Sequence, residues 1–411
     1  MHAIMRPMSR FGFVFLSAWL SSCTPIQPIT NAPTITPRTL MLVESEPSET
    51  TLDRPDIANA SEVWQNLFQN AKRSIDIANF YASEADSPWL ASSKLAPIIE
   101  TLAAAQKRGV KVRVLLDEKF IPQYRSTLEK LESSGLEIRR IDGDSVFGGV
   151  QHAKYFVVDG SVSFIGSQNF DWRALDHIQE LGVQAESPTM ADLLLEIFET
   201  DWAIAGGSER TIRIQKKTAV AQIPDIDTQH VELVASPKGW LPREESWELP
   251  RILGLIDSAK ESIRVQVLKY KTVNRAGDQF LDLDAALRRA ATRGVKVQML
   301  VSEWALKDSE VLKNLGPGVD VRVIQIPKFS GGEIPFARVA HAKYMVVDGR
   351  AAWIGSSNWE GDYFLKSRNV GVIISGGGKT PARLAKFFEE NWTSSYVAPL
   401  ANLISPPSAA P

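Results

Sequence analysis

Apolar and polar positions alternate along the chain with two periods, one typical of helices and one typical of strands. The helical period predicts helices over 63–71, 95–108, 124–134 and 193–205. Runs typical of strands lie between them, over 74–80, 110–116 and 136–141. Strands that alternate with helices in this way are typical of an α/β fold in which helices connect neighbouring strands.

The same order of segments occurs a second time. Segments 71–75, 108–112 and 197–202 recur as 259–263, 293–297 and 387–392, so the offset between the copies is nearly constant. A near-constant offset of this kind indicates two copies of one structural unit. We therefore predict two half-domains, at 46–206 and 232–397, joined by a connection at 207–231 and followed by a loose tail at 398–411.

The segment 1–22 has the layout of a signal peptide. Arg6 and Arg10 precede an apolar run at 11–20, which is too short to span a bilayer comfortably. Cys23 follows shortly after this run and is the only cysteine, so it has no disulfide partner. The ending resembles the bacterial lipobox, in which the cysteine is lipidated. The alternatives are an unmodified thiol in a discarded signal peptide and an uncleaved anchor.

A proline-rich stretch follows Cys23, and we expect the lipidated cysteine and an extended tether to occupy 23–45. This reading predicts a lipoprotein of the cell envelope, anchored to a bacterial membrane and facing the periplasm or the exterior. Secretion without an anchor is the alternative.

Composition limits the partners of the protein. The 411 residues include 46 basic and 48 acidic side chains, so the formal net charge is −2. No overall basic excess draws the protein to nucleic acid or to anionic lipid. A polyanionic substrate would therefore be held by a local group of positive side chains.

One polar pattern stands out because it occurs in both copies with identical internal spacing. The pattern consists of a histidine, a lysine two positions later, an aspartate five positions after that, and then a Gly-Ser-x-Asn segment. In the first copy these residues are His152, Lys154, Asp159, Ser167 and Asn169. In the second copy they are His341, Lys343, Asp348, Ser356 and Asn358.

A hairpin accounts for this spacing. The Asp-Gly pairs at Asp159 and Asp348 are turn signals between two strand-like runs. Residues two apart in a strand share a face. One end of each hairpin therefore displays the histidine, the lysine, the serine and the asparagine. Each aspartate lies at the turn, roughly 23 Å along the strand from its own histidine, so we predict a structural role for both aspartates.

The end of each hairpin that carries these four residues is called its working end. If the two working ends face each other, they form a site suited to a phosphodiester. We expect the lysines to neutralise the non-bridging oxygens, and the amides and hydroxyls of Asn169, Asn358, Ser167 and Ser356 to donate hydrogen bonds. One histidine can attack phosphorus and the other can protonate the leaving oxygen. No metal or other cofactor is predicted, because the lysines supply the positive charge and no cluster has metal-ligand spacing.

Glu180 is the candidate for orienting a catalytic imidazole, and Asn369 occupies the corresponding place in the second copy. A carboxylate beside one histidine and an amide beside the other would give the two imidazoles different acid–base properties, because the carboxylate favours the imidazolium form. We hypothesise that the first copy, which carries Glu180, supplies the nucleophile His152, and that His341 is the acid. A surface carboxylate is the alternative reading of Glu180.

These residues resemble the phospholipase D superfamily, whose hallmark is a doubled His-x-Lys-x4-Asp motif followed by Gly-Ser-x-Asn. Segments 169–175, 180–183, 334–339 and 357–364 are similar to the branch of lysosomal phospholipase D-like 5′ exonucleases and poxviral relatives. The resemblance implies two pseudo-symmetric α-β-β-α lobes with one active site at their interface, and it suggests single-stranded nucleic acid as a substrate. The chain departs from the animal proteins in having no disulfide cysteines and in its lipoprotein-like start.

The leading hypothesis is therefore a metal-independent phosphodiesterase that acts through a phosphohistidine. Phospholipid and single-stranded nucleic acid both remain open as substrates, because the expected membrane anchor favours the first and the branch resemblance favours the second. A non-catalytic, envelope-associated phosphate-binding or scaffold protein that keeps the fold is the alternative. Since both motifs occur in one chain, we expect a monomer to be sufficient for activity.

Overall fold

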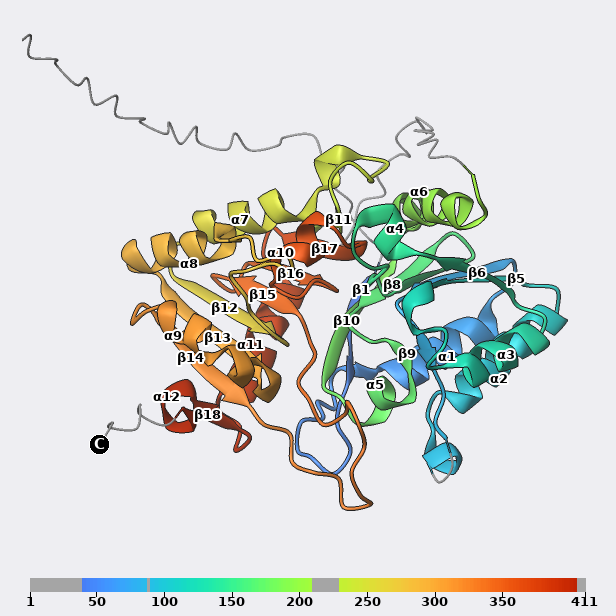
Figure 1. Ribbon diagram of the computed structural model, residues 1–411, viewed down its shortest axis with the longest axis horizontal. Coiled ribbons are helices and arrows are strands. Elements are labelled where there is room, and N and C mark those ends of the chain that lie inside the picture. Colours follow the sequence, from blue (N-terminus) through green and yellow to red (C-terminus); the bar gives the residue numbers. More distant parts are fainter. Residues whose placement is uncertain (1–38, 87–88, 209–228, 405–411) are drawn as a thin grey trace, which may run out of the picture.

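The computed structural model of the chain describes residues 39–86, 89–208 and 229–404. The predicted signal peptide and Cys23 lie outside these residues. Figure 1 shows two halves side by side, the first blue to green and the second yellow to red. Each half is built on one eight-stranded sheet.

The first half follows the predicted order of strands and helices. Its main elements are β1 (Thr39–Ser45), β2 (Ala58–Asn59), α1 (Ala60–Asn70), β3 (Ser74–Asn79), α2 (Ala96–Lys107), β5 (Lys111–Asp117), α3 (Arg125–Ser133), β6 (Glu137–Ile141), α4 (Gly143–Phe147), β7 (Tyr155–Val158), β8 (Val162–Gly166), α5 (Trp172–Asp176), β10 (Glu180–Glu186) and α6 (Pro188–Ala205). Short strands β4 (Ala82–Ser83) and β9 (Phe170–Asp171) pair with each other, and η1 (Trp89–Ser92) and η2 (Glu118–Phe120) are 3-10 turns.

The second half repeats this order. Its elements are β11 (His230–Ser236), η3 (Glu244–Ser246), α7 (Glu248–Ser258), β12 (Ser262–Val267), α8 (Asp282–Thr292), β13 (Lys296–Ser302), η4 (Glu303–Asp308), α9 (Ser309–Asn314), β14 (Val319–Ile324), β15 (Tyr344–Val347), β16 (Ala351–Gly355), α10 (Gly361–Leu365), β17 (Asn369–Ser375), α11 (Lys379–Trp392), β18 (Val397–Pro399) and α12 (Leu400–Leu403). The predicted repeat is therefore a repeat of structure.

Seven strands follow the same order in the two sheets, and each sheet has one further edge strand, β2 in the first and β18, at the opposite edge, in the second. The first runs β2-β1-β10-β8-β7-β3-β5-β6, and the second runs β11-β17-β16-β15-β12-β13-β14-β18. In the first sheet, β3 pairs antiparallel with the motif hairpin on one side and parallel with β5 on the other. In the second sheet, β12 pairs in the same way with the motif hairpin and with β13. Both hairpins therefore lie at the centre of their sheets.

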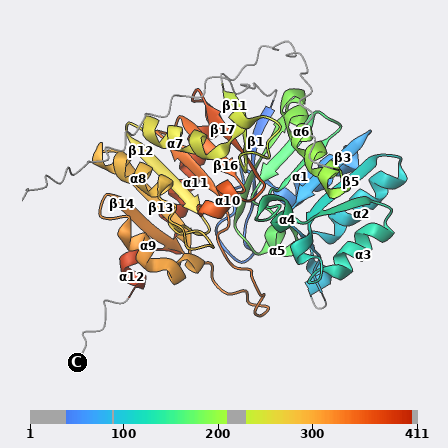
Figure 2. The same ribbon diagram turned by 45° about the horizontal axis from the view of Figure 1, so that its top comes forward.

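The layers of the fold follow from which face each residue buries. Helices α1, α2 and α3 cover the outer face of the first sheet, and α7 and α8 cover the outer face of the second. The inner faces share a single apolar core with α6 and α11 (Figures 1 and 2). Because this core belongs to both halves, the halves are held against each other by apolar burial as well as by polar contacts.

The first sheet begins earlier in the chain than the sequence indicates. The tether was expected to extend to residue 45, but residues Thr39–Ser45 form β1, which pairs antiparallel with β10. Leu42 and Val43 on this strand are buried. Pro37 is the last proline before the strand, so the residues that follow it are free to donate to a sheet.

The predicted boundaries also move at two other places. Strand β11 begins at His230, inside the expected connection, although the His230 side chain is exposed. The expected loose tail starts with β18, which pairs with β14, and with the short helix α12, whose Leu400 is buried. Both segments gain structure from partners that are distant in sequence.

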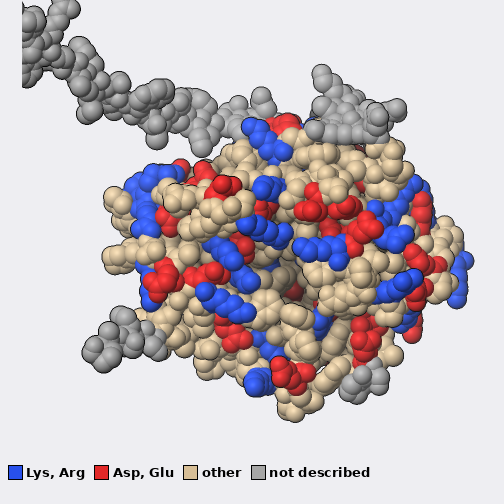
Figure 3. Space-filling model, in the orientation of Figure 1, with Lys and Arg blue, Asp and Glu red and all other residues tan. Residues whose placement is uncertain are grey.

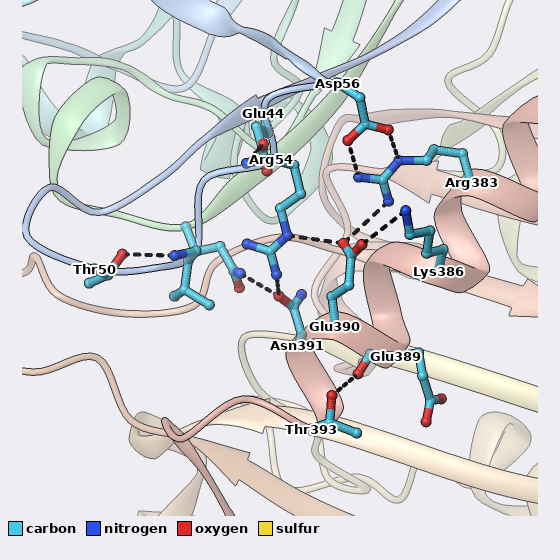
Figure 4. A network of polar contacts seen from close by, with 12 residues as sticks. Glu44, Thr50, Arg54, Asp56, Arg383, Lys386, Glu389, Glu390, Asn391 and Thr393 are labelled. Carbon is cyan, nitrogen blue, oxygen red and sulfur yellow. Dashed lines mark hydrogen bonds and ion pairs between the residues drawn. The ribbon is translucent and has the colours of Figure 1, made fainter.

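The segment between β1 and β2 crosses to the second half and docks on α11 (Figure 4). Arg54 Nε donates to Glu390 Oε2 at 3.2 Å, and Arg54 Nη2 donates to Asn391 Oδ1 at 2.5 Å. Asp56 forms an ion pair with Arg383 at 2.6 Å. This segment therefore ties the N-terminal part of the described chain to the second half.

Candidate active site

The predicted hairpins are present in both halves. Strands β7 and β8 pair antiparallel, as do β15 and β16. Asp159 and Gly160 form the first turn with φ of 54° and 62°, and Asp348 and Gly349 form the second with φ of 52° and 63°. Two consecutive residues with positive φ are typical of the tight hairpin turn that an Asp-Gly pair favours.

Both motif aspartates hold main chain at the turn end of the hairpin. The Asp159 carboxylate accepts from the amides of Arg73 at 2.6 Å and Ser74 at 3.0 Å. The Asp348 carboxylate accepts from the amides of Glu261 at 2.9 Å and Ser262 at 2.8 Å. These bonds lower the pKa of each aspartate, although partial burial opposes them. The aspartates therefore anchor the start of β3 and β12, in keeping with a structural role.

Main-chain bonds across the interface bring the two working ends together. The His152 amide donates to the Arg368 carbonyl at 2.8 Å, and the His341 amide donates to the Gln179 carbonyl at 2.8 Å. In return, the Arg368 amide donates to Val150, and the Gln179 amide donates to Val339. Each histidine is thus fixed by the half that does not carry it.

The side-chain partners of the histidines are crossed in the same way. His152 Nδ1 lies 2.9 Å from Asn369 Oδ1. His341 Nδ1 lies 2.8 Å from both carboxylate oxygens of Glu180. The expectation that Glu180 serves the first copy is therefore wrong, because the carboxylate orients the histidine of the other half. The interface explains why each histidine contacts a partner from the other half. Strands β10 and β17 each begin next to the motif of the opposite half.

The orientation of the Asn369 amide is set by its surroundings. Its Nδ2 donates to the Tyr363 carbonyl at 2.8 Å, and Ser356 Oγ donates to its Oδ1 at 2.9 Å. The amide oxygen therefore faces His152, whose Nδ1 must carry the proton of this hydrogen bond. As a result, Nε2 of a neutral His152 is an unprotonated, nucleophilic nitrogen.

The two lysines occupy equivalent positions beside the histidines. Lys154 Nζ donates to the His152 carbonyl at 2.5 Å, and Lys343 Nζ donates to the His341 carbonyl at 2.5 Å. Both lysines are almost completely buried. Burial lowers the pKa of Lys154 well below its usual value and lowers the pKa of Lys343 to about 7, although the Glu180 carboxylate opposes this shift. A bound anion would favour the charged form of both lysines, so the two buried side chains make the site suited to an anion.

The titration of the remaining groups also follows from burial. Burial and the charge of Lys154 lower the pKa of His152 well below its usual value. Burial and Lys343 lower the pKa of His341 as well. Burial raises the pKa of Glu180 to about 8, although Lys343 opposes this shift. Burial thus favours the neutral carboxyl form of Glu180 and the neutral form of His341. When one proton is shared between Glu180 and His341 Nδ1, His341 Nε2 carries a hydrogen, whichever of the two groups holds the shared proton.

The two motif asparagines are buried, and the Oδ1 atom of each lacks a hydrogen-bond partner. A buried amide with an unpaired oxygen is costly unless a ligand or solvent completes it. An amide oxygen accepts hydrogen bonds, whereas phosphoryl oxygens need donors, so the predicted role of Asn169 and Asn358 in phosphate binding depends on their Nδ2 groups and stays a prediction.

The motif serines differ from this expectation. Ser167 Oγ bonds the Leu181 main chain, and Ser356 Oγ bonds both Val370 and Asn369. Since these hydroxyls already have protein partners, the predicted role in phosphate binding finds no support for either serine. They hold the adjacent strand, and each also contacts the partner of a histidine: Ser356 bonds Asn369, and Ser167 bonds the Glu180 carboxyl group.

Sequence reasoning missed several residues around the histidines. The rings of Phe80 and Tyr363 lie 4.9 Å and 4.8 Å from the His152 ring. Behind the histidines, Arg368 forms a buried ion pair with Asp201 at 2.8 Å, and Gln179 Nε2 donates to Asn391 Oδ1 at 3.0 Å. The repeat could have found these two pairs, because Gln179 and Arg368 are equivalent positions of the two copies, as are Asp201 and Asn391.

The third histidine near the motifs and two neighbouring tryptophans have structural surroundings. His177 Nδ1 lies 3.2 Å from Ser48 Oγ, and its ring packs between Trp172 and Phe329. Trp353 and Trp359 are fully buried in the core of the second half. These two tryptophans therefore do not line a substrate groove.

Within the described ranges, no group of three or more His, Cys, Asp or Glu side chains could hold a metal ion. Metal independence stays a prediction. None of the helices in the described part of the chain is long and apolar enough to cross a bilayer.

A family match covers the chain in two pieces. Residues 65–202 and 252–392 both match the family described as "Cardiolipin synthase, PLD-like domain". The two pieces coincide with the two halves of the fold.

Curated relatives extend the similarity over most of the chain. The 5'-3' exonuclease PLD3 of Bos taurus is 30% identical over 401 residues, which cover 89% of this chain and 81% of the relative. The 5'-3' exonuclease PLD4 of Mus musculus is 29% identical over 400 residues, covering 88% and 79%. A Caenorhabditis elegans protein named as a probable phospholipase D is 29% identical over 373 residues, covering 82% and 67%.

A solved structure supports the fold. Phosphatidylserine synthase of Haemophilus influenzae Rd KW20 has a TM-score of 0.59 at 13% identity, covering 84% of this chain and 87% of that one. At this identity the likeness concerns the fold alone.

Two pseudo-symmetric α/β halves with a doubled His-Lys motif at their interface define the class of phosphoric diester hydrolases built on this fold. The chain belongs to the PLD-like domain family of the phospholipase D superfamily. The predicted fold class and the predicted family are thereby confirmed.

Proposed function

We propose that the protein hydrolyses phosphodiesters through a phosphohistidine on His152, with His341 as the general acid and base. The observation that carries this proposal is the unequal pairing of the histidines. An amide oxygen faces His152 Nδ1, whereas a carboxyl group, whose pKa is raised by burial, faces His341 Nδ1. His152 therefore offers a lone pair and His341 offers a proton.

The geometry supports a two-step reaction. In the first step, His152 Nε2 attacks phosphorus, the bond to the leaving oxygen breaks, and His341 Nε2 donates its proton to that oxygen. In the second step, His341 takes a proton from water, the hydroxide attacks phosphorus, and the bond between phosphorus and His152 breaks. Lys154 and Lys343 stabilise the negative charge on the phosphoryl oxygens in both steps. Asn169 and Asn358 position these oxygens by hydrogen bonds.

The proposed substrate is single-stranded nucleic acid, cleaved in the manner of a 5′ exonuclease. The curated relatives named as 5'-3' exonucleases support this choice. A second support is the partly exposed ring of Phe80, which lies beside His152 with Lys154 Nζ over it and so places an aromatic side chain at the reactive centre, within reach of a base. Phospholipid is the competing substrate. Since one chain carries both motifs, we propose that a monomer is sufficient for activity.

We also propose that the enzyme is a lipoprotein of the cell envelope, lipidated at Cys23 and tethered by the residues before β1. Its predicted signal peptide and lone cysteine support this location. Labelling of cells with a radioactive fatty acid should mark the wild-type protein and leave Cys23→Ser unmarked. Secretion of an unlabelled wild-type protein into the medium would favour the alternative.

The test of the chemistry uses the soluble chain from Thr24, with EDTA present throughout. We expect turnover of a p-nitrophenyl phosphodiester and of single-stranded DNA, and little turnover of phosphatidylcholine vesicles. The p-nitrophenolate group leaves without a proton, so His341→Asn should still complete the first step and accumulate phosphoenzyme. Peptide mapping should place the phosphoryl group on His152.

Three results would count against the proposal. Phosphoenzyme that maps to His341 would reverse the roles of the histidines. Loss of all turnover in EDTA, restored by a metal ion, would contradict metal independence. A folded protein that turns over no diester would favour the non-catalytic alternative.

A further inference from the structure

The two rims of the active site carry different chemistry at equivalent positions of the repeat. Strands β3 and β12 are equivalent, and each ends beside the site. The two residues after β3 are Phe80 and Tyr81, and the two after β12 are Leu268 and Lys269. An aromatic rim thus belongs to the first half and a basic rim to the second.

The aromatic rim is a cluster of four rings that adjoins His152. The Phe80 ring lies 4.9 Å from the His152 ring, 4.8 Å from Phe120 and 5.5 Å from Tyr81. Tyr81 lies 5.3 Å from Phe120 and 5.0 Å from Tyr124, and Phe120 lies 6.3 Å from Tyr124. Each of these four side chains is partly exposed, so the cluster presents aromatic surface beside the reactive histidine.

The polar ends of the tyrosines are held inside the protein. Tyr81 Oη donates to Asp171 Oδ2 at 2.9 Å, and Arg173 Nη2 donates to Tyr124 Oη at 3.0 Å. Asp171 and Arg173 form an ion pair at 2.8 Å, so a single buried ion pair holds both tyrosine rings. The rings are therefore held rigidly before a ligand arrives, which reduces the entropy lost on binding.

The equivalent positions in the second half do not carry this aromatic cluster. Leu268 is buried, and Ala305 occupies the place equivalent to Phe120. Lys269 lies over the Trp304 ring at 5.8 Å, and Lys271 pairs with Asp308 at 3.6 Å.

Positive charge on this rim extends to the reactive centre. Lys271, Lys269 and Arg275 all lower the pKa of Glu360, although its burial raises that pKa overall. Arg275 also acts on His152. In Figure 3, Lys and Arg side chains border a hollow in the middle of the face between the halves. A polyanion that enters the site therefore meets positive charge on the rim of the second half.

We propose that these rims form a binding track for a single strand, with bases against the aromatic cluster of Phe80, Phe120, Tyr81 and Tyr124 and phosphates on Lys269, Lys271 and Arg275. This inference rests on the proposed function and adds the surface that selects the substrate. Rings on one side and cations on the other match a chain whose bases and phosphates project to opposite sides. A phospholipid offers a phosphate but no ring to stack.

The decisive variant is Phe120→Ala, because this side chain contacts neighbouring rings but cannot form hydrogen bonds. Binding of a phosphorothioate-linked oligothymidine of about ten nucleotides should weaken roughly 5- to 100-fold. Binding of an abasic strand of the same length should change less than about twofold, since it has no bases to stack. Phe120→Tyr keeps the ring and should restore oligothymidine binding. Leu281→Ala, at an exposed apolar residue outside the track, is the matched control.

The basic rim is tested with Lys269→Gln, and Lys296→Gln at the far end of β13 is the matched control. Removal of one phosphate contact should weaken the oligothymidine and the abasic strand alike. It should also reduce the slope of log K against log salt by about 0.7. The control should leave the slope unchanged.

The outcomes separate this inference from the proposed function. If the wild-type enzyme turns over the p-nitrophenyl diester but Phe120→Ala weakens both strands equally, the track is wrong and the catalytic proposal stands. If oligothymidine binds as described but no diester is turned over, the track stands and the catalytic proposal fails. Wild-type binding to phosphatidylcholine vesicles in place of oligothymidine overturns the track in favour of a lipid.

Discussion

The two halves of the active site differ in what lies behind each histidine. Behind His152 is the neutral amide of Asn369, followed by Arg368, whose guanidinium pairs with Asp201. Behind His341 is the carboxyl group of Glu180, followed by Gln179, which bonds an amide. On the His341 side, the charged residue Glu180 contacts the histidine directly. On the His152 side, the charged residues Arg368 and Asp201 lie one residue further away, behind the neutral Asn369. The comparison teaches that a duplicated motif can keep its geometry while its partners assign different chemical roles to the copies.

The largest effect is expected from Glu180→Gln, which makes the His341 side resemble the His152 side. The amide keeps a hydrogen-bond acceptor for Nδ1 but cannot share a proton with the imidazole. We expect kcat on single-stranded DNA to fall about 10²- to 10⁴-fold, the usual contribution of general acid–base catalysis. Formation of phosphoenzyme from a p-nitrophenyl diester should fall much less, because its leaving group needs no proton.

Stopped-flow measurement of p-nitrophenolate release and steady-state turnover of DNA check this prediction together. An equal loss on both substrates would mean that Glu180 acts before proton transfer, for example by holding His341 in place.

The next effect concerns the pairs behind the histidines. Asp201→Asn removes the partner charge of Arg368, whose guanidinium is fully buried. A buried charge left without its partner costs about 3–5 kcal/mol in the free energy of unfolding. Asn391→Ala, at the equivalent position of the repeat, breaks amide hydrogen bonds and should cost about 1–3 kcal/mol. Urea denaturation of both variants measures the difference in the free energy of unfolding. Equal losses in the two variants would show that the charged pair contributes no more to stability than the amide pair.

The pH dependence sharpens the comparison at the lysines. Burial lowers the pKa of Lys343 to about 7, so its positive charge is lost as the pH rises through this value. Burial keeps the pKa of His152 well below its usual value, so the nucleophile stays neutral in weakly acidic solution. Burial also lowers the pKa of Lys154 well below its usual value, so both lysines lose positive charge as the pH rises. We therefore expect kcat/KM on a p-nitrophenyl diester to fall as the pH rises through about 7, by up to about tenfold per pH unit. Activity that rises steadily from weakly acidic to alkaline solution would contradict this sign.

Much of this site could be predicted from the sequence because its signals are local. The spacing of the motif fixes the hairpin, the Asp-Gly pair fixes the turn, and the constant offset between the copies locates the second motif. A period-two pattern then determines that His152 and Lys154 share one end.

The partners of the histidines could not be predicted, because they depend on how the halves meet. Glu180 is much closer in sequence to His152 than to His341, and yet it bonds the distant one. The register of β10 against the opposite motif decides this pairing, and no local pattern encodes that register. The structure of 39–45 was missed for the same reason, since β1 exists only through its pairing with β10.

The smallest effect is expected at the two serines, which contact the partners of different histidines. Ser356 Oγ donates to Asn369 Oδ1 at 2.9 Å, whereas Ser167 Oγ bonds the Leu181 main chain and the Glu180 carboxyl group. Ser356→Ala therefore removes one bond that orients the amide beside His152. The Asn369 Nδ2 bond to Tyr363 remains, so the loss corresponds to a single hydrogen bond, about 0.5–1.5 kcal/mol or roughly 2- to 10-fold in the rate of phosphoenzyme formation from a p-nitrophenyl diester. Ser167→Ala is the counterpart on the Glu180–His341 side and should leave that rate nearly unchanged, because the p-nitrophenolate group leaves without a proton. Equal rates for the two variants would show that the fixed tautomer of His152 does not depend on the Ser356 hydroxyl.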